Sequence, residues 1–137
     1  MKLIAIEEHF LTSEIRKYWK EFADVDPIHT LDFGHTDVLL DEVGTERLSR
    51  MDETGVDVQV LSLTTPGVHN LKENSAELSK QTNDWLATII ASKPERYQGF
   101  ATLPTPVPKL AAPELERAAT KLGFKGAMLC GRTREKI

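Results

Sequence analysis

The sequence predicts an α/β fold in which short apolar strands alternate with amphipathic helices. Four apolar runs are spaced along the 137 residues, in the order strand, helix, helix, strand, helix, strand, helix, strand. Short apolar strands suit a sheet that is covered on both faces, which indicates parallel pairing. Repeated right-handed crossovers then leave two architectures open: a doubly wound open sheet and the first half of a (β/α)₈ barrel.

Four apolar runs define the predicted strands, and the second is especially rich in β-branched residues. The first run carries charge at its C-terminal end. The third run stops at Pro104, which cannot donate a backbone hydrogen bond. The runs are residues 3–8, 56–63, 97–103 and 125–130.

Two helical patterns follow the first strand. An apolar stripe at i, i+3, i+4 and i+7 predicts a helix that Thr12 or Ser13 caps and that reaches Phe22. A shorter helix contains Leu48, and Gly55 can close it in the left-handed conformation.

The connection between residues 10 and 44 is long for a compact domain and is rich in Asp. Long loops often act as lids or oligomer contacts. We favour a solvated acidic excursion instead, because exposure is the usual fate of Asp. His29 and His35 have no regular ligand spacing, so we expect both at the surface.

Two more helices are expected in the second half of the chain. Asn74 and Glu77 resemble a capping box before an apolar stripe that Pro94 ends. The last helix is expected to begin at Pro113, as its first residue, and to stop at Gly123. The prolines before it predict an extended connector: Pro104, Pro106 and Pro108.

Composition excludes several classes of protein. A net charge of −4 and an isoelectric point near 5.6 argue against a nucleic-acid partner. No apolar run reaches the roughly 18 residues of a membrane span, and the N-terminus lacks signal-peptide features. The single cysteine, Cys130, lies in an apolar run, which predicts a buried free thiol. We therefore expect a cytoplasmic protein with neither a nucleic acid nor a membrane as partner.

The end of the first strand is the candidate metal site. Successive strand side chains point to opposite faces, so Glu7 and His9 share one face and Glu8 takes the other. A carboxylate and an imidazole are common ligands of divalent metals. From these residues alone, an exposed acidic strand end with a solvated histidine is the alternative. No glycine-rich nucleotide loop follows the strand, whereas a barrel places catalytic groups at the C-terminal ends of its strands.

Five segments in a fixed order carry a resemblance that covers nearly the whole chain. They are residues 7–10 (Glu-Glu-His-Phe), 51–57, 61–68, 100–104 (Phe-Ala-Thr-Leu-Pro) and 123–127. Together they resemble the amidohydrolase-related metal-dependent decarboxylase family. The chain is most similar to dihydroxybenzoate decarboxylases of the γ-resorcylate type, and aminocarboxymuconate semialdehyde decarboxylase is a more distant relative. The resemblance implies a (β/α)₈ TIM barrel.

The resemblance also implies a site and a reaction. Glu7 and His9 would be ligands of one divalent metal, Zn²⁺ or Mn²⁺, while Glu8 would face the helix layer and form an ion pair. Thr65 and Pro66 would lie near the substrate, although a simple turn is the alternative for this Pro-Gly segment. The implied reaction is non-oxidative decarboxylation of a small hydroxyaromatic carboxylic acid by a carboxy-lyase.

Two alternative functions remain open at this point. Related family members are hydrolases of lactones or amides and need the same first-strand ligands. A non-catalytic remnant is the third possibility.

The chain departs from the family pattern because it stops soon after the fourth strand. A complete barrel typically has about 250 residues. The family's remaining metal ligands, a His after strand five and an Asp after strand eight, would lie in a missing half, as would the proton donor. We therefore expect residues 1–137 to be the truncated N-terminal half of a barrel domain and the fragment alone to be inactive. The family also implies a homo-oligomer.

Overall fold

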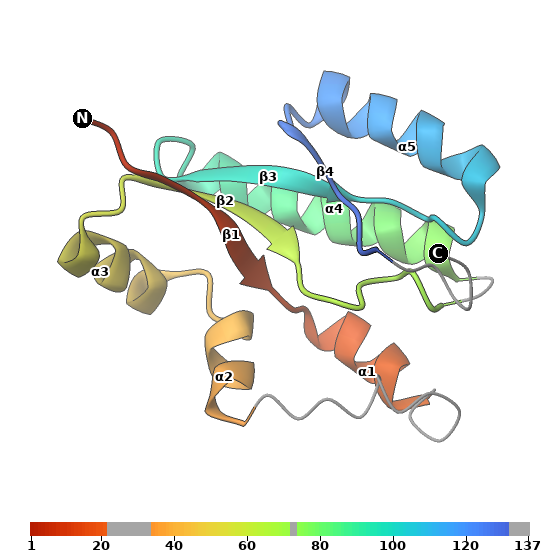
Figure 1. The fold of residues 1–137 in the computed structure, drawn as a ribbon, viewed down its shortest axis with the longest axis horizontal. Coiled ribbons are helices and arrows are strands. Elements are labelled where there is room, and N and C mark those ends of the chain that lie inside the picture. Colours follow the sequence, from red (N-terminus) through yellow and green to blue (C-terminus); the bar gives the residue numbers. More distant parts are fainter. Residues whose placement is uncertain (22–33, 72–73, 132–137) are drawn as a thin grey trace.

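The computed structural model describes residues 1–21, 34–71 and 74–131. Its centre is a parallel sheet with the strand order β1-β2-β3-β4 (Figure 1). The strands are β1 (Ile4–Phe10), β2 (Val58–Leu63), β3 (Tyr97–Thr102) and β4 (Gly126–Met128). The helices are α1 (Ser13–Glu21), α2 (His35–Asp41), α3 (Thr45–Thr54), α4 (Ser75–Ser92) and α5 (Pro108–Lys121).

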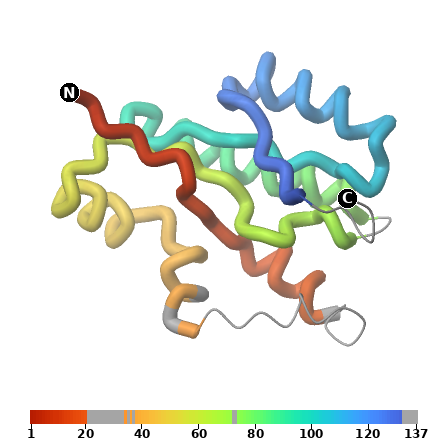
Figure 2. The backbone as a smooth tube through the Cα atoms, in the orientation of Figure 1, coloured from red at the N-terminus to blue at the C-terminus, as the bar shows by residue number. Residues whose placement is uncertain are grey.

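The strand order decides between the two predicted architectures. Each strand pairs in parallel with the strand that follows it in the sequence. A doubly wound sheet reverses its order at a switch point, whereas a (β/α)₈ barrel adds its strands in sequence order. The described sheet therefore has the topology of the first part of a barrel, with β1 at one edge and β4 at the other (Figure 2).

Helix α4 packs closely against the sheet and runs behind it in Figure 1. A Cβ added at Gly99 of β3 would lie 2.9 Å from Ile90 Cδ1 and 3.0 Å from Leu86 Cδ2, so the missing side chain lets the helix approach the strand. Tyr97 and Ala101 lie two residues to either side of Gly99, share its face and are fully buried. The core therefore lies between this face of the sheet and the helices.

An irregularity in β1 decides which of its side chains face the core. Ala5 pairs with Gln59, but Glu8 pairs with Leu61, so two residues of β1 stand opposite a single residue of β2. This two-against-one pairing is the pattern of a β-bulge. Before the bulge, the even-numbered Ile4 lies on the sheet face of Val58 and Ser62. After the bulge, the odd-numbered His9 lies on that same face.

Several helix ends confirm the sequence predictions. The backbone N–H of Ile15 donates to Thr12 Oγ1 at 3.3 Å, as expected of a residue that caps α1. Helix α3 ends at Gly55, whose φ of 74° is left-handed. Gly123 follows α5 with the same φ of 74°. Glycine reaches this region without the penalty that a Cβ imposes.

Two predictions about helix starts are wrong. Asn74 precedes α4 but makes no side-chain cap hydrogen bond, because its φ of −82° and ψ of −6° are helical rather than extended. Helix α5 begins at Pro108, not at Pro113, so Pro113 lies inside the helix. Pro108 takes the first-turn position, where a missing N–H has no consequence. The connector before α5 is therefore shorter than expected.

The first connection contains an element that was not predicted. Helix α2 lies within the segment expected to be an acidic excursion. It has only seven residues and no complete apolar stripe, so periodicity does not reveal it. Phe22 and His29 lie outside the described residues, as does the side chain of His35.

The predicted burial of Cys130 is wrong, because this residue follows a strand at the edge of the sheet. Cys130 is a free thiol, as expected, but it is half-buried rather than buried. It follows the edge strand β4, and its neighbour Leu129 is 60% exposed. Across the described residues, every helix is too short or too polar for a membrane span.

Candidate metal centre

Glu7 and His9 lie side by side near the C-terminal end of β1. Glu7 Oε2 is 3.7 Å from His9 Nε2, and the two side chains are 79% and 34% exposed. The strand extends to Phe10, so this pair lies within β1 rather than just beyond it. The predicted juxtaposition of the two side chains is present. Their role as metal ligands stays a prediction.

Ser62 of β2 holds the imidazole from the other side. It pairs with His9 in the strand register, and its Oγ lies 2.9 Å from His9 Nδ1. Ser62 is fully buried. Sequence reasoning missed this residue, and the available signal was a single hydroxyl in an otherwise apolar strand. The contact leaves Nε2 facing Glu7.

The donor set fits a divalent metal. When Nδ1 carries the proton and donates to Ser62 Oγ, Nε2 keeps its lone pair for a metal, an arrangement common among metal-bound histidines. Zinc bonds to nitrogen and oxygen are about 2.0–2.2 Å long, so one ion can contact two atoms 3.7 Å apart. The described part of the chain holds no group of three or more His, Cys, Asp or Glu suited to a metal. Among the described residues, Glu7 and His9 are therefore two candidate ligands.

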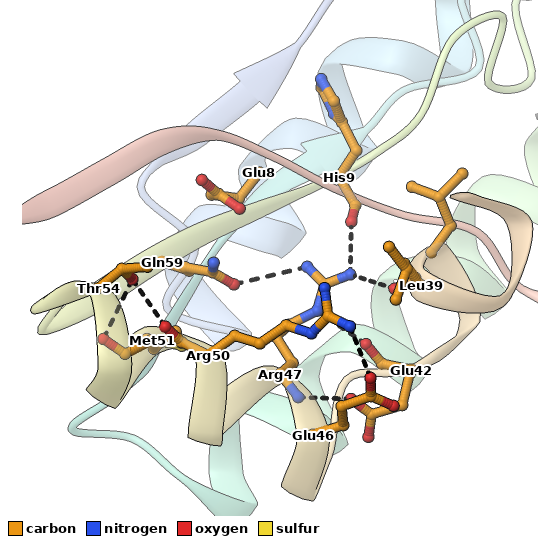
Figure 3. Close-up of a pocket in the computed structure, with 11 residues that line it drawn as sticks. Glu8, His9, Leu39, Glu42, Glu46, Arg47, Arg50, Met51, Thr54 and Gln59 are labelled. Atoms are coloured by element: carbon orange, nitrogen blue, oxygen red, sulfur yellow. Dashed lines mark hydrogen bonds and ion pairs between the residues drawn. The ribbon is translucent and has the colours of Figure 1, made fainter. Parts of the chain in front are cut away.

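Glu8 faces the other side of the sheet, as expected. It lines a groove of about 330 Å³ between β1 and helices α2 and α3, together with Arg47 and Gln59 (Figure 3). The ion pair predicted for Glu8 is not formed with any described residue. Burial lowers the pKa of Arg47, while the charge of Glu8 acts in the opposite direction. The Glu8 side chain thus faces the helices α2 and α3 and not the candidate metal site.

Thr65 and Pro66 follow β2 at the same end of the sheet. The backbone N–H of Thr64 donates to Phe10 O at 2.9 Å, which joins the ends of β2 and β1. The Thr65–Pro66 peptide bond is cis, and Trp19 Nε1 donates to Gly67 O at 2.9 Å. Thr65 is exposed whereas Pro66 is buried. Only Thr65 of this pair presents its side chain to solvent.

His69 is a second residue that sequence reasoning missed. It is 2% exposed, and its Nδ1 lies 3.0 Å from Thr105 Oγ1 in the segment after β3. Burial lowers the pKa of His69 below its ordinary value of 6.5, which keeps the ring neutral at pH 7. A Cβ at Gly67 would come within 3.2 Å of the ring. His69 therefore joins the segments that follow two neighbouring strands at the candidate-site end of the sheet.

The family model for amidohydrolases matches residues 63–134. The chain belongs to the amidohydrolase family. Its relatives among curated proteins include the γ-resorcylate decarboxylases of Polaromonas sp., 37% identical over 130 residues, and of Rhodococcus jostii, 34% identical over 139 residues. Both alignments cover 93% of this amidohydrolase-family chain and 38% of the relative. The chain thus spans less than half the length of these relatives.

Solved structures of amidohydrolase-family decarboxylases share the fold. Dihydroxybenzoic acid decarboxylase from Polaromonas sp., solved with manganese and the inhibitor 2-nitroresorcinol, is 36% identical with a TM-score of 0.81. The match covers 98% of this chain and 40% of that one. 5-Carboxyvanillate decarboxylase from Novosphingobium aromaticivorans, solved with manganese and a nitrobenzoic acid, is 29% identical with a TM-score of 0.87, over 96% and 42% of the two chains. The described sheet and helices match the N-terminal part of these TIM barrels.

Proposed function

We propose that the complete protein is a metal-dependent carboxy-lyase that removes carbon dioxide from a small hydroxyaromatic carboxylic acid. The observation that carries the proposal is the convergence of Glu7 and His9, 3.7 Å apart, at the strand end where barrels place their catalytic groups. The curated relatives include γ-resorcylate decarboxylases, and two related structures were solved with manganese and an aromatic ligand.

The residues at the candidate site have separate roles in this proposal. Glu7 and His9 hold one divalent ion, Mn²⁺ or Zn²⁺, and Ser62 fixes the imidazole through Nδ1. When bound, the ion supplies positive charge that binds a substrate carboxylate with its neighbouring hydroxyl and stabilises negative charge. Thr65, whose side chain is exposed after β2, offers a hydroxyl to the substrate, and the buried Pro66 shapes the turn that presents it.

Residues 1–137 are proposed to form the N-terminal half of the barrel domain. The 38% coverage of the curated relatives supports this. The group that protonates the ring carbon, and the remaining metal ligands, would come from the rest of the domain. We therefore expect the 137-residue chain to be inactive on its own. The cytoplasmic location expected from the composition and the homo-oligomeric assembly implied by the family remain predictions.

The decisive assay measures the products formed by the complete protein with 2,6- or 2,3-dihydroxybenzoate and added Mn²⁺ or Zn²⁺. A decarboxylase releases carbon dioxide and the corresponding phenol. A hydrolase, the second candidate within the same family, leaves the dihydroxybenzoates unchanged and forms a ring-opened acid from an aromatic lactone supplied in a parallel reaction. Absence of both turnover and metal uptake would favour a non-catalytic remnant and contradict the proposal.

A further inference from the structure

Arg47 of α3 lies behind β1, on the side opposite the His9 imidazole (Figure 3). Its guanidinium is directed at backbone carbonyls from separate elements. Nη2 donates to His9 O at 3.0 Å and to Leu39 O at 2.8 Å, and Nε donates to Glu42 O at 2.8 Å. Nη1 lies 3.5 Å from Gln59 Oε1 of β2. One side chain of α3 therefore contacts β1, β2, α2 and the residue that directly follows α2.

The His9 carbonyl, unlike that of Phe10, points away from β2. Phe10 O accepts from the N–H of Thr64, directly after β2, so the carbonyl of Phe10 faces β2. Backbone groups of successive strand residues point to opposite sides, so the carbonyl of His9 faces away from β2. On that side, no described strand pairs with β1. Leu11 N donates to Leu40 O of α2 on the same side. Arg47 and the end of α2 thus satisfy the outer edge of β1 where the strand carries His9.

The position of Arg47 is itself fixed by Glu42. One carboxylate oxygen of Glu42 accepts from Gly44 N at 2.7 Å, and the other accepts from Arg47 N at 2.6 Å. Negative charge at a helix N-terminus is stabilising. The guanidinium is also largely buried, and a buried charge needs its hydrogen-bond partners in place. Arg47 is therefore held at both its backbone and its side chain.

We propose that Arg47 is a positioning residue for His9, an inference that rests on the proposed metal site. The bulge interrupts the β1–β2 pairing just before Glu8, so regular pairing alone specifies the local backbone weakly. Arg47 holds the backbone carbonyl of His9 through Nη2, and Ser62 holds the ring of His9 through Nδ1. Together the two contacts set where Nε2 stands relative to Glu7.

The test compares Arg47→Met with Arg117→Met in the complete protein. Arg117 is a matched control because it is also partly buried and bridges Asp84 and Glu114, on α4 and α5, rather than β1. The first readout is the ¹⁵N shifts of the His9 imidazole in metal-free protein at pH 7.5. We expect them to move in Arg47→Met, as the contact with Ser62 loosens, and to stay in place in Arg117→Met. The second readout is the Mn²⁺ dissociation constant, expected to rise about tenfold in Arg47→Met only.

Two outcomes separate this inference from the proposed function. A folded Arg47→Met variant with unchanged His9 shifts overturns the positioning role, whatever its metal affinity. Complete wild-type protein that takes up no Mn²⁺ refutes the metal site, while the His9 shifts still decide the role of Arg47. If Arg47→Met does not fold, exchange of the Nε–H protons in wild-type chain decides. We expect Arg47 to exchange more slowly than Arg50, whose side chain is 53% exposed, and equal rates overturn the inference.

Discussion

His9 of β1 and Ser62 of β2 stand opposite each other in the strand register, with 2.9 Å between Nδ1 and Oγ. The hydroxyl is fully buried and the imidazole is only partly so. This contact directs Nδ1 of the imidazole toward β2 and leaves Nε2 beside Glu7. It gives the proposed metal site its most direct experimental test that leaves both ligands intact.

Ser62→Ala is expected to weaken Mn²⁺ binding about tenfold, because loss of the hydroxyl frees the ring of a proposed ligand to rotate. The free energy of unfolding should fall by only about 0.5–1.5 kcal/mol, since water can reach part of His9. Mn²⁺ titration followed by electron paramagnetic resonance, with urea unfolding alongside, measures both effects. Ser79→Ala is the matched control, because Ser79 Oγ is buried with no hydrogen-bond partner in the described structure. Equal metal affinity in both variants would contradict the role of Ser62.

Glu7→Gln and His9→Ala are expected to raise the metal dissociation constant of the complete protein by more than about 100-fold. The reason is that supporting partners of a ligand already account for about 10–100-fold. Metal content after gel filtration, measured by mass spectrometry, gives the answer. Glu8→Gln is the control, because Glu8 is adjacent in sequence but faces the α3 groove. Stoichiometric metal in His9→Ala would rule out the assignment.

Gly99→Ala is expected to destabilise the fold by about 1–3 kcal/mol through overpacking. The added Cβ would lie 2.9 Å from Ile90 and 3.0 Å from Leu86, so α4 side chains would have to move. Thermal and urea unfolding both report the change. Gly131→Ala serves as control, since a Cβ there meets nothing within 4 Å. A Gly99→Ala variant as stable as Gly131→Ala would show that α4 packs less closely on β3 than described.

His69 is expected to make stability depend on pH. Burial holds the pKa of the folded ring below the ordinary value of 6.5, so the unfolded chain binds the proton more readily. The contribution of His69 to stability is therefore complete above about pH 6.5 and is lost as the pH falls through the folded pKa. Urea midpoints at pH 7.5 and 5.0 should differ more in wild type than in His69→Gln. An identical pH dependence would mean that His69 is accessible to protons in the folded state.

Local rules located most of the fold because the features involved depend on neighbouring residues. The four apolar runs form the four strands, and Gly55 ends its helix in the conformation that glycine favours. Thr12 caps α1 because its hydroxyl accepts from the N–H of Ile15, only three residues away. The Asn74 cap failed because capping needs an extended backbone at that residue, which composition does not guarantee.

Tertiary contacts account for what the sequence did not reveal. Helix α2 is short, and its contact with β1 joins Leu40 to Leu11, which lies much earlier in the chain. Ser62 and His69 acquire their roles from partners 53 and 36 residues away, His9 and Thr105. The juxtaposition of Glu7 and His9 could be predicted because two side chains of one strand meet locally. Their role as metal ligands, which the family resemblance implies, stays a prediction.

The irregular pairing between Ala5 and Glu8 divides β1 into two parts whose side chains alternate in opposite order. Counting by twos from Ile4, which pairs with Val58, would direct Glu8 rather than His9 toward the Ser62 side of the sheet. The extra residue reverses that parity. Adding or removing one residue upstream of it therefore changes which side chains cover Val58, yet leaves the imidazole pointing the same way. The direction of the His9 side chain, a proposed metal ligand, therefore does not depend on the number of residues before the bulge.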